Sequence, residues 1–162
     1  MLGRSIAGVK MPLFVFFGRA GVLAAVLTFC CIASAAPQVS ARAATLEAIR
    51  MLENPRGLET PGPGGELGAY QFREATWRQY THAPFAQAND RQLSDRVAEQ
   101  HYDWLKSRLE AHGMKATPYT IALAWNAGIS AVVRGRMSPA AIDYATRASA
   151  LAAEFEGVAT SR

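Results

Sequence analysis

The chain contains little cysteine: of its 162 residues only Cys30 and Cys31 carry a thiol. Both lie in the N-terminal stretch, ahead of the segment that we predict to be the folded domain. A domain without cysteine has neither a disulfide nor thiol chemistry. Disulfide-rich secreted scaffolds and enzymes with a cysteine nucleophile are therefore excluded.

Sequence patterns of several other chemistries are missing as well. His82, His101 and His112 do not have the spacing of a zinc-binding helix, so we expect no metal and no other cofactor. The glycines between residues 57 and 68 fit neither the dinucleotide-binding nor the phosphate-loop pattern. The segment around Ser130 lacks the second glycine of a nucleophile elbow.

Acidic residues are absent from residues 1–35, which contain Arg4, Lys10 and Arg19. The net charge of +4 comes mainly from this stretch, because the rest of the chain holds fourteen Lys and Arg against thirteen Asp and Glu. Nucleic-acid-binding domains usually carry a basic face. A nearly neutral domain argues against nucleic acid as a partner.

The N-terminal stretch has the three parts of an export signal. A basic segment up to Arg19 precedes the apolar run 20–32, and small residues ending at Ala35 suit a signal peptidase. We therefore predict a signal peptide over residues 1–35 and a periplasmic or extracellular protein. The alternative is an uncleaved leader that anchors the protein, because residues 13–36 are long enough to span a bilayer if Arg19 is tolerated.

The remainder of the chain has room for one domain of ordinary size. We predict a linker over residues 36–43, the domain over residues 44–157 and a short tail over residues 158–162. Hydrophobic residues recur with the helical period from Ala44 onward. The predicted apolar face of this first helix consists of Ala44, Ala48, Met51 and Leu52.

Prolines and glycines divide the domain further. Pro55 ends the first helix near Glu53, a glycine-rich loop covers residues 57–68, and a short helix follows over residues 74–80. Cap and stop residues then predict three more helices. These run from Leu93 to Gly113, from Thr117-Pro118 to Gly128, and from Ser138-Pro139 to Gly157. Because no segment alternates with period two for long, we predict an all-α fold.

Glu53 is the first candidate for catalysis. It lies in the last turn of a helix, where the negative end of the helix dipole disfavours a carboxylate. Its apolar neighbours Leu52 and Pro55 favour partial burial, which also raises the pKa of a carboxyl group. A carboxyl that stays protonated near neutral pH is suited to general acid catalysis. The alternative is an ordinary surface glutamate at a helix end.

Three other motifs contain residue types that bind sugars. In Gly68-Ala69-Tyr70-Gln71 the glycine allows close backbone approach, and an amide and an aromatic ring follow it. Trp125-Asn126-Ala127-Gly128 places an aromatic ring beside an amide at a helix end, and Asp143-Tyr144 lies on the last helix. Each motif alone also fits a structural role: a tight turn, a helix end and a helix face.

In their order and spacing these motifs resemble those of the lysozyme-like lytic transglycosylases, soluble bacterial domains that cleave peptidoglycan. That family has a Glu-Ser pair at a helix end and then a glycine-rich stretch ending in Gly-Leu-Met-Gln. Glu53-Asn54 and Gly68-Ala69-Tyr70-Gln71 look like these two motifs, and the 18 residues from Glu53 to Gln71 match the family's separation. Residues 125–128 are similar to its Tyr-Asn-Ala-Gly, and Tyr144-Ala145 to its late Tyr-Val.

The resemblance covers residues 44–156 and implies a small lysozyme-like helical domain with a glycine-rich loop. It also implies that Glu53 alone protonates the bond between N-acetylmuramic acid and N-acetylglucosamine and then activates the muramyl 6-hydroxyl. The partner would be peptidoglycan glycan strands, and the product a 1,6-anhydro sugar. Substrate binding would fall to Asn54, Gly68, Tyr70, Gln71, Trp125, Asn126 and Tyr144. Asn54, Tyr70 and Trp125 stand where the family has serine, methionine and tyrosine.

Two other functions fit the same residues. A lysozyme-type hydrolase needs a second carboxylate, which Glu59, Glu66 or Glu74 would supply. Glu66 in the glycine loop is the best placed of the three, although a charged loop residue is more often simply solvated. A non-catalytic wall-binding module, part of an envelope assembly such as a secretion apparatus, would keep Tyr70 and Trp125 and tolerate loss of Glu53.

The leader gives the first testable prediction. Signal peptidase should cleave after Ala35, because small residues follow the apolar run there. Sequencing the N-terminus of protein recovered from outside the cytoplasm checks this cleavage. Recovery of the intact leader in the membrane fraction would show that it is an anchor instead.

Overall fold

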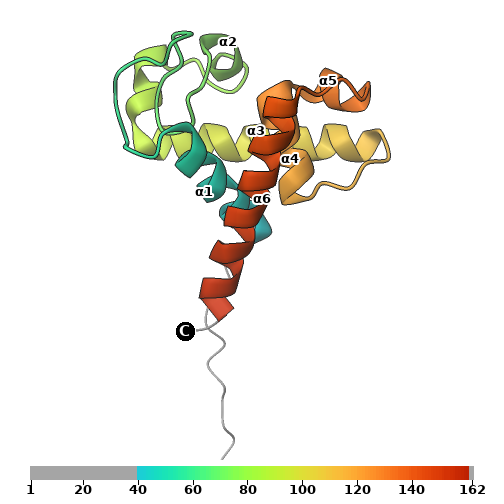
Figure 1. The fold of residues 1–162 in the computed structure, drawn as a ribbon. Helices are drawn as coiled ribbons and strands as arrows, with labels where there is room; N and C mark the ends of the chain where they lie inside the picture. The colour runs from blue at the N-terminus through green and yellow to red at the C-terminus, as the bar shows by residue number, and fades with distance from the viewer. Residues whose placement is uncertain (1–39, 161–162) are drawn as a thin grey trace, which may run out of the picture. The chain divides into compact units, whose positions relative to one another are not determined.

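The computed structural model describes residues 40–160, and this part of the chain is all-α, as predicted (Figure 1). The predicted signal peptide lies outside the described residues, as does the first half of the predicted linker, residues 36–39. None of the described helices is both long and apolar enough to cross a membrane. The helices are α1 (Ala41–Glu53), α2 (Glu74–Trp77), the 3₁₀-helix η1 (Phe85–Asn89), α3 (Arg91–Ala111), α4 (Pro118–Ala127), α5 (Ile129–Val133) and α6 (Pro139–Thr160).

Side-chain caps fix several helix starts. The Thr117 hydroxyl accepts the backbone N–H of Thr120, whose side chain accepts the N–H of Thr117, and Pro118 is the first residue of α4. The Ser138 hydroxyl accepts the N–H of Ala141 at the start of α6. These two predicted starts are confirmed, because the capping residues determine them locally.

Other boundaries differ from the predictions. α1 begins at Ala41, inside the predicted linker, because Ser40 caps it by accepting the N–H of Ala43. α6 continues past Gly157 to Thr160, since an isolated glycine weakens a helix without ending it. Helix α2 is shorter than predicted, and η1 and α5 were not predicted. Five residues, the length of each of these two, are too few to show a helical period.

Helix α6 packs along both α1 and α4 (Figure 1). Between α1 and α6 the contact is made by small side chains: Ala44, Ala48 and Ala152 are fully buried. Alanines at a helix contact let the two axes approach closely. The prediction of Met51 on this face is wrong, because its side chain is 37% exposed. Helix α1 is covered by α3 and α4 as well as α6, so its apolar face extends to Ile49 instead.

A group of aromatic side chains fills the other part of the core. The ring of Phe72 lies 6.0 Å from that of Trp77 and 5.8 Å from that of Trp125, between centroids. Trp77 is fully buried, and its indole N–H donates to the carbonyl of Ala83 at 3.0 Å. These rings join the end of the glycine loop to α4, and the candidate site lies beside them.

The α1–α6 contact predicts a steric effect on stability. Ala48→Leu should lower the free energy of unfolding by about 1–3 kcal/mol, because the added methylenes have no space between the helices. Urea unfolding measures the change. Met51→Leu, on the exposed side of the same helix, is the matched control and should change stability by less than about 0.5 kcal/mol. Equal effects of the two substitutions would contradict the described packing.

Candidate active site

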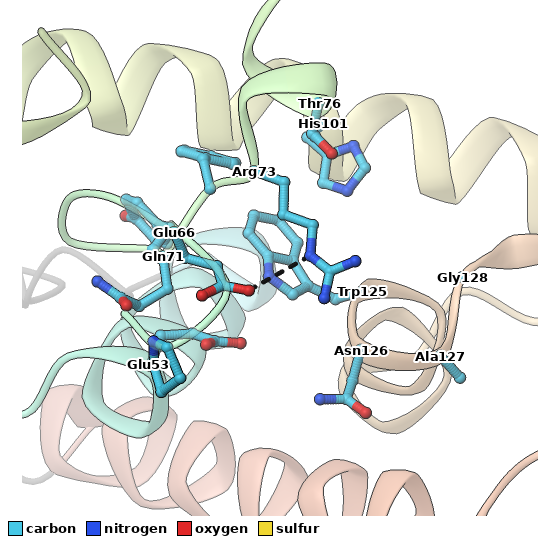
Figure 2. Close-up of a pocket in the computed structure, with 13 residues that line it drawn as sticks. Glu53, Glu66, Gln71, Arg73, Thr76, His101, Trp125, Asn126, Ala127 and Gly128 are labelled. Carbon is cyan, nitrogen blue, oxygen red and sulfur yellow. Dashed lines mark ion pairs between the residues drawn. The ribbon is translucent and has the colours of Figure 1, made fainter. Parts of the chain in front are cut away.

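A cleft of about 590 Å³ lies between the glycine loop and the end of α4 (Figure 2). Five of the predicted site residues line it: Glu53, Tyr70, Gln71, Trp125 and Asn126. A smaller cavity of about 240 Å³ shares three lining residues with this cleft: Glu53, Pro63 and Gln71. Glu53 therefore borders both cavities, where they meet.

Glu53 is the last residue of α1 and is half-buried. The hydroxyl of Tyr144 on α6 donates to its Oε1 at 2.8 Å. Burial raises the pKa of the Glu53 carboxyl, and the negative charge of Glu66 raises it further, while the Tyr144 hydrogen bond acts in the opposite direction. The net shift is upward, which is the direction expected from the sequence.

Tyr144 was predicted to line the cleft, and the structure gives it another position. It lines neither of the two cavities, and its hydroxyl donates to the Glu53 carboxyl. This contact joins residues 91 positions apart in the sequence. Tyr144 therefore orients the Glu53 carboxyl and links α6 to the end of α1.

A tight turn brings Gln71 into the cleft. Leu67 and Phe72 exchange backbone hydrogen bonds of 3.0 and 2.9 Å, which closes the turn of residues 68–71. Gly68 has a φ of +80°, and a Cβ there would overlap the carbonyl oxygen of Ala88. The close approach that Gly68 permits is therefore to η1, whereas the sequence suggested an approach to a sugar.

Gln71 has the only positive φ, +46°, among the non-glycine residues that the structure describes. Its Nε2 donates to the carbonyl of Gly68 at 3.0 Å, and its side chain lines both cavities. A Cβ at Gly62 would lie 2.6 Å from Oε1 of Gln71, so a side chain at this position would displace the amide. A left-handed backbone at a non-glycine residue is strained, and such residues are common at functional sites.

Asn54 lies under the loop, where its side chain makes three hydrogen bonds. Its Nδ2 donates to the carbonyls of Leu58 at 2.8 Å and Gly68 at 3.2 Å, and its Oδ1 accepts the N–H of Leu58 at 2.8 Å. Only 6% of the residue is exposed. A serine has a single hydroxyl and could not make all three bonds. Asn54 therefore holds the start of the loop against the Gly68 turn, beside the smaller cavity.

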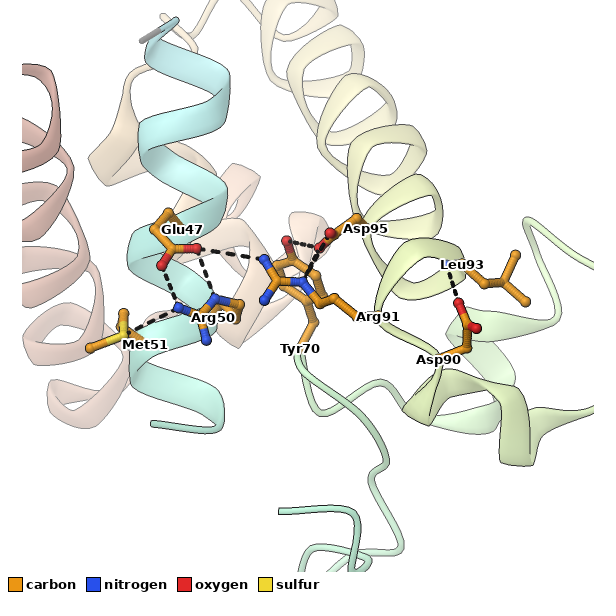
Figure 3. Close-up of polar contacts among 8 residues, drawn as sticks. All are labelled: Glu47, Arg50, Met51, Tyr70, Asp90, Arg91, Leu93 and Asp95. Atoms are coloured by element: carbon orange, nitrogen blue, oxygen red, sulfur yellow. Dashed lines mark hydrogen bonds and ion pairs between the residues drawn. The ribbon is translucent and has the colours of Figure 1, made fainter. Parts of the chain in front are cut away.

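Tyr70 points mainly into the protein, and 3% of the residue is exposed. Its hydroxyl donates to Asp95 at 2.8 Å, and Asp95 pairs with Arg91, which reaches Glu47 on α1 (Figure 3). Its ring lies 6.0 Å from that of Trp125. Tyr70 thus anchors the turn to α3, and little of its surface is left for a ligand.

The motif at the end of α4 forms the opposite wall of the cleft. Trp125 is half-buried and Asn126 is exposed, and both line the cleft (Figure 2). Gly128 follows with a φ of +82° and ends α4. Figure 2 shows the Asn126 amide across the cleft from Glu53. The structure therefore brings together an acid, two amides and an aromatic surface, contributed by Glu53, Gln71, Asn126 and Trp125.

Glu66 lines the same cleft and is held in place by the glycine loop. Its Oε2 accepts the N–H of Gly64 at 2.8 Å, and its Oε1 pairs with Arg73 at 3.4 Å (Figure 2). Hydrogen bonds from backbone amides, with the Arg73 charge, hold the pKa of Glu66 below its ordinary value. A Cβ at Gly64 would overlap the Glu66 carboxylate. Glu66 is thus part of the site, whereas Glu59 and Glu74 are exposed and outside both cavities.

Three further lining residues, Arg73, Thr76 and His101, were not among the predicted site residues. His101 lies within the helix predicted from Leu93 to Gly113, and a helical period does not show whether a given face meets a core or a cleft. Arg73 and Thr76 belong to no motif. Within residues 40–160 no group of three His, Asp, Glu or Cys side chains has the arrangement of a metal site.

Comparisons with known proteins leave the family open. The chain matches no family model, and neither curated proteins nor solved structures include one detectably similar to it. The resemblance to lytic transglycosylases therefore rests on the order and spacing of the motifs. The possible roles of the site residues follow from their geometry.

The raised pKa of Glu53 predicts how stability depends on pH. The folded protein keeps this proton at a pH where the unfolded chain, with an ordinary pKa of 4.5, has lost it. The stability that the group contributes is full below that value and is lost as pH rises through the folded pKa. Glu53→Gln does not titrate and keeps an oxygen that accepts from Tyr144. The free energy of unfolding of Glu53→Gln, minus that of the unchanged protein, should therefore increase from about pH 4 to about pH 8.

Urea unfolding of the two proteins at both pH values measures this difference. The other titrating groups are common to both proteins, so their contributions largely cancel. A difference that stays constant with pH, or that changes in the opposite direction, would show that the carboxyl is not held in its protonated form.

Proposed function

We propose that the protein is an exported lytic transglycosylase with a lysozyme-like fold, which cleaves the glycan strands of peptidoglycan with Glu53 as its acid. The observation that supports this most is the position of Glu53: a half-buried carboxyl with a raised pKa where two cavities meet. An acid placed there has a sugar unit on either side of the bond that it protonates. The order of the motifs along the chain supports the same function.

One carboxyl serves both steps of this reaction. Glu53 gives its proton to the oxygen between N-acetylmuramic acid and N-acetylglucosamine, and the bond from the muramyl C1 to that oxygen breaks. The Glu53 carboxylate then takes the proton of the muramyl 6-hydroxyl, whose oxygen bonds to C1. The products are a 1,6-anhydro muramyl end and a free N-acetylglucosamine hydroxyl, and Glu53 is protonated again. The Tyr144 hydroxyl stabilises the carboxylate between the two steps.

The rest of the cleft suits an amino-sugar polymer. Gln71 and Asn126 present side-chain amides that can pair with N-acetyl and hydroxyl groups. Trp125 offers an aromatic surface for a sugar ring, as binding sites commonly combine apolar walls with a few polar groups. Asn54 and Tyr70 hold the turn that carries Gln71 in position, and Tyr144 holds the Glu53 carboxyl.

Glu66 favours a second candidate, a lysozyme-type hydrolase. The pKa of Glu53 is raised and that of Glu66 is lowered. A glycosidase that activates water usually has two carboxyl groups shifted in this way. Glu66, however, already accepts from Gly64 and pairs with Arg73, and a lowered pKa makes it a weak base. In the transglycosylase its charge helps to keep the proton on Glu53. We therefore place hydrolysis second.

The products released from purified sacculi distinguish these functions. Mass spectrometry should find mainly 1,6-anhydro muramyl ends, which are lighter by one water than hydrolytic ends and resist borohydride reduction. Glu53→Gln should lower the rate of release by a factor of at least about 100, because it removes the transferred proton. Binding of this variant to sacculi should persist, since the residues that line the cleft are otherwise unchanged.

Glu66→Gln is the matched variant for the second candidate. If the protein is a hydrolase, the unchanged protein gives reducible ends and Glu66→Gln abolishes them. If it is a transglycosylase, the ends released by Glu66→Gln are still anhydro sugars. Sacculi that are bound but left intact by the unchanged protein would indicate a non-catalytic wall-binding module, such as a component of an envelope secretion assembly.

A further inference from the structure

We infer that the end of the cleft away from Glu53 is a binding subsite for an N-acetylated amino sugar, in which His101 hydrogen-bonds the sugar and Trp125 contacts its ring. The inference deepens the proposed function and rests on it, because it assigns a second sugar unit of the same strand. Figure 2 shows His101 and Thr76 on the other side of the cleft from Glu53. All four residues line this cleft.

The His101 ring is held in one orientation by its neighbours. Its centroid lies 4.7 Å from the ring of Trp125, edge to face, and 5.9 Å from the ring of Trp104, nearly parallel at 13°. The Tyr80 hydroxyl lies 2.9 Å from Nδ1. A ring that contacts two indoles and is hydrogen-bonded at one nitrogen is preorganised, so little side-chain entropy is lost when a ligand binds.

The second ring nitrogen is available to a ligand. Nε2 of His101 has no hydrogen-bond partner among the residues that the structure describes. Burial lowers the pKa of His101 to about 4, so the ring is uncharged at neutral pH. A neutral imidazole presents either a donor or an acceptor at Nε2, according to its tautomer. A sugar hydroxyl can pair with both forms, because it donates and accepts.

The surrounding surface also matches a sugar ring. Phe72 and Trp125 supply aromatic carbon, and Thr76 supplies a hydroxyl beside His101. A pyranose has an apolar C–H face and a rim of hydroxyl groups, so it needs both kinds of surface. His101 lines the cleft wall, so a ligand in the cleft can reach its Nε2.

Binding of chitopentaose, a β-1,4-linked oligomer of N-acetylglucosamine, tests the subsite. We use the protein with Glu53→Gln, so that the oligomer is not cleaved. Adding His101→Phe keeps an aromatic ring between Trp104 and Trp125 and removes both nitrogens. The dissociation constant measured by calorimetry should rise about tenfold, as expected for loss of one hydrogen bond. His82→Phe, an exposed histidine outside the cleft, is the matched control and should bind as before.

A second measurement does not depend on the folding of the variant. The NMR signals of the His101 imidazole should shift when chitopentaose saturates the protein that carries only Glu53→Gln. Equal affinities of the His101→Phe and His82→Phe proteins, an imidazole signal that does not move, or no binding of chitopentaose would each overturn the inference.

The two proposals can fail separately. If His101→Phe weakens the binding of chitopentaose but the unchanged protein releases nothing from sacculi, the subsite stands and the transglycosylase proposal fails. If the unchanged protein cleaves sacculi but His101→Phe leaves the affinity for chitopentaose unchanged, the transglycosylase proposal stands and the subsite fails.

Discussion

The geometry of the cleft depends on the buried side chain of Asn54. Its amide joins the end of α1 to the start of the glycine loop and to the Gly68 turn. Because Glu53 is the preceding residue and Gln71 ends that turn, the same three bonds set the acid and the amide relative to each other. A buried amide that loses its partners destabilises a fold by more than the modest net gain of each bond. The loop is therefore ordered although it contains little regular structure.

The ionisable groups of the cleft divide into neutral and charged ones. Burial raises the pKa of Glu53, which favours its neutral form, and lowers the pKa of His101 to about 4, which leaves the imidazole uncharged at neutral pH. The charged groups, Glu66 and Arg73, pair with each other at 3.4 Å. A cleft with so little unpaired charge suits an uncharged polymer backbone better than a phosphate or a metal ion. The electrostatics thus agree with the proposed glycan ligand, independently of the motifs.

The local signals in the sequence were the accurate ones. Helix starts at Thr117 and Ser138 were predictable, because a capping hydroxyl and the following proline act within one turn. The raised pKa of Glu53 also follows from nearby features, its helix end and its apolar neighbours. The four long helices, α1, α3, α4 and α6, and the position of Glu53 at the end of α1 are therefore predictable from local signals.

Side-chain direction in the loop was not predictable. Tyr70 turns inward because Asp95, 25 residues away, accepts its hydroxyl, and Tyr144 meets Glu53 across 91 residues. Glu66 appeared to be a solvated charge because its partners, the Gly64 amide and Arg73, become apparent only once the loop is folded. An irregular loop has no period from which such contacts can be inferred.

The costs in stability are concentrated at the cleft. Gln71 adopts a positive φ that glycine would adopt without strain, and Glu53 is a desolvated carboxyl at the unfavourable end of a helix. Neither residue is the one that stability alone would favour at its position. Both side chains line the two cavities, and the Gly62 site leaves room for the Gln71 amide. Other residues at these two positions would make the fold more stable. Because the less stable choice occurs where the two cavities meet, it supports a role for Glu53 and Gln71 in ligand chemistry.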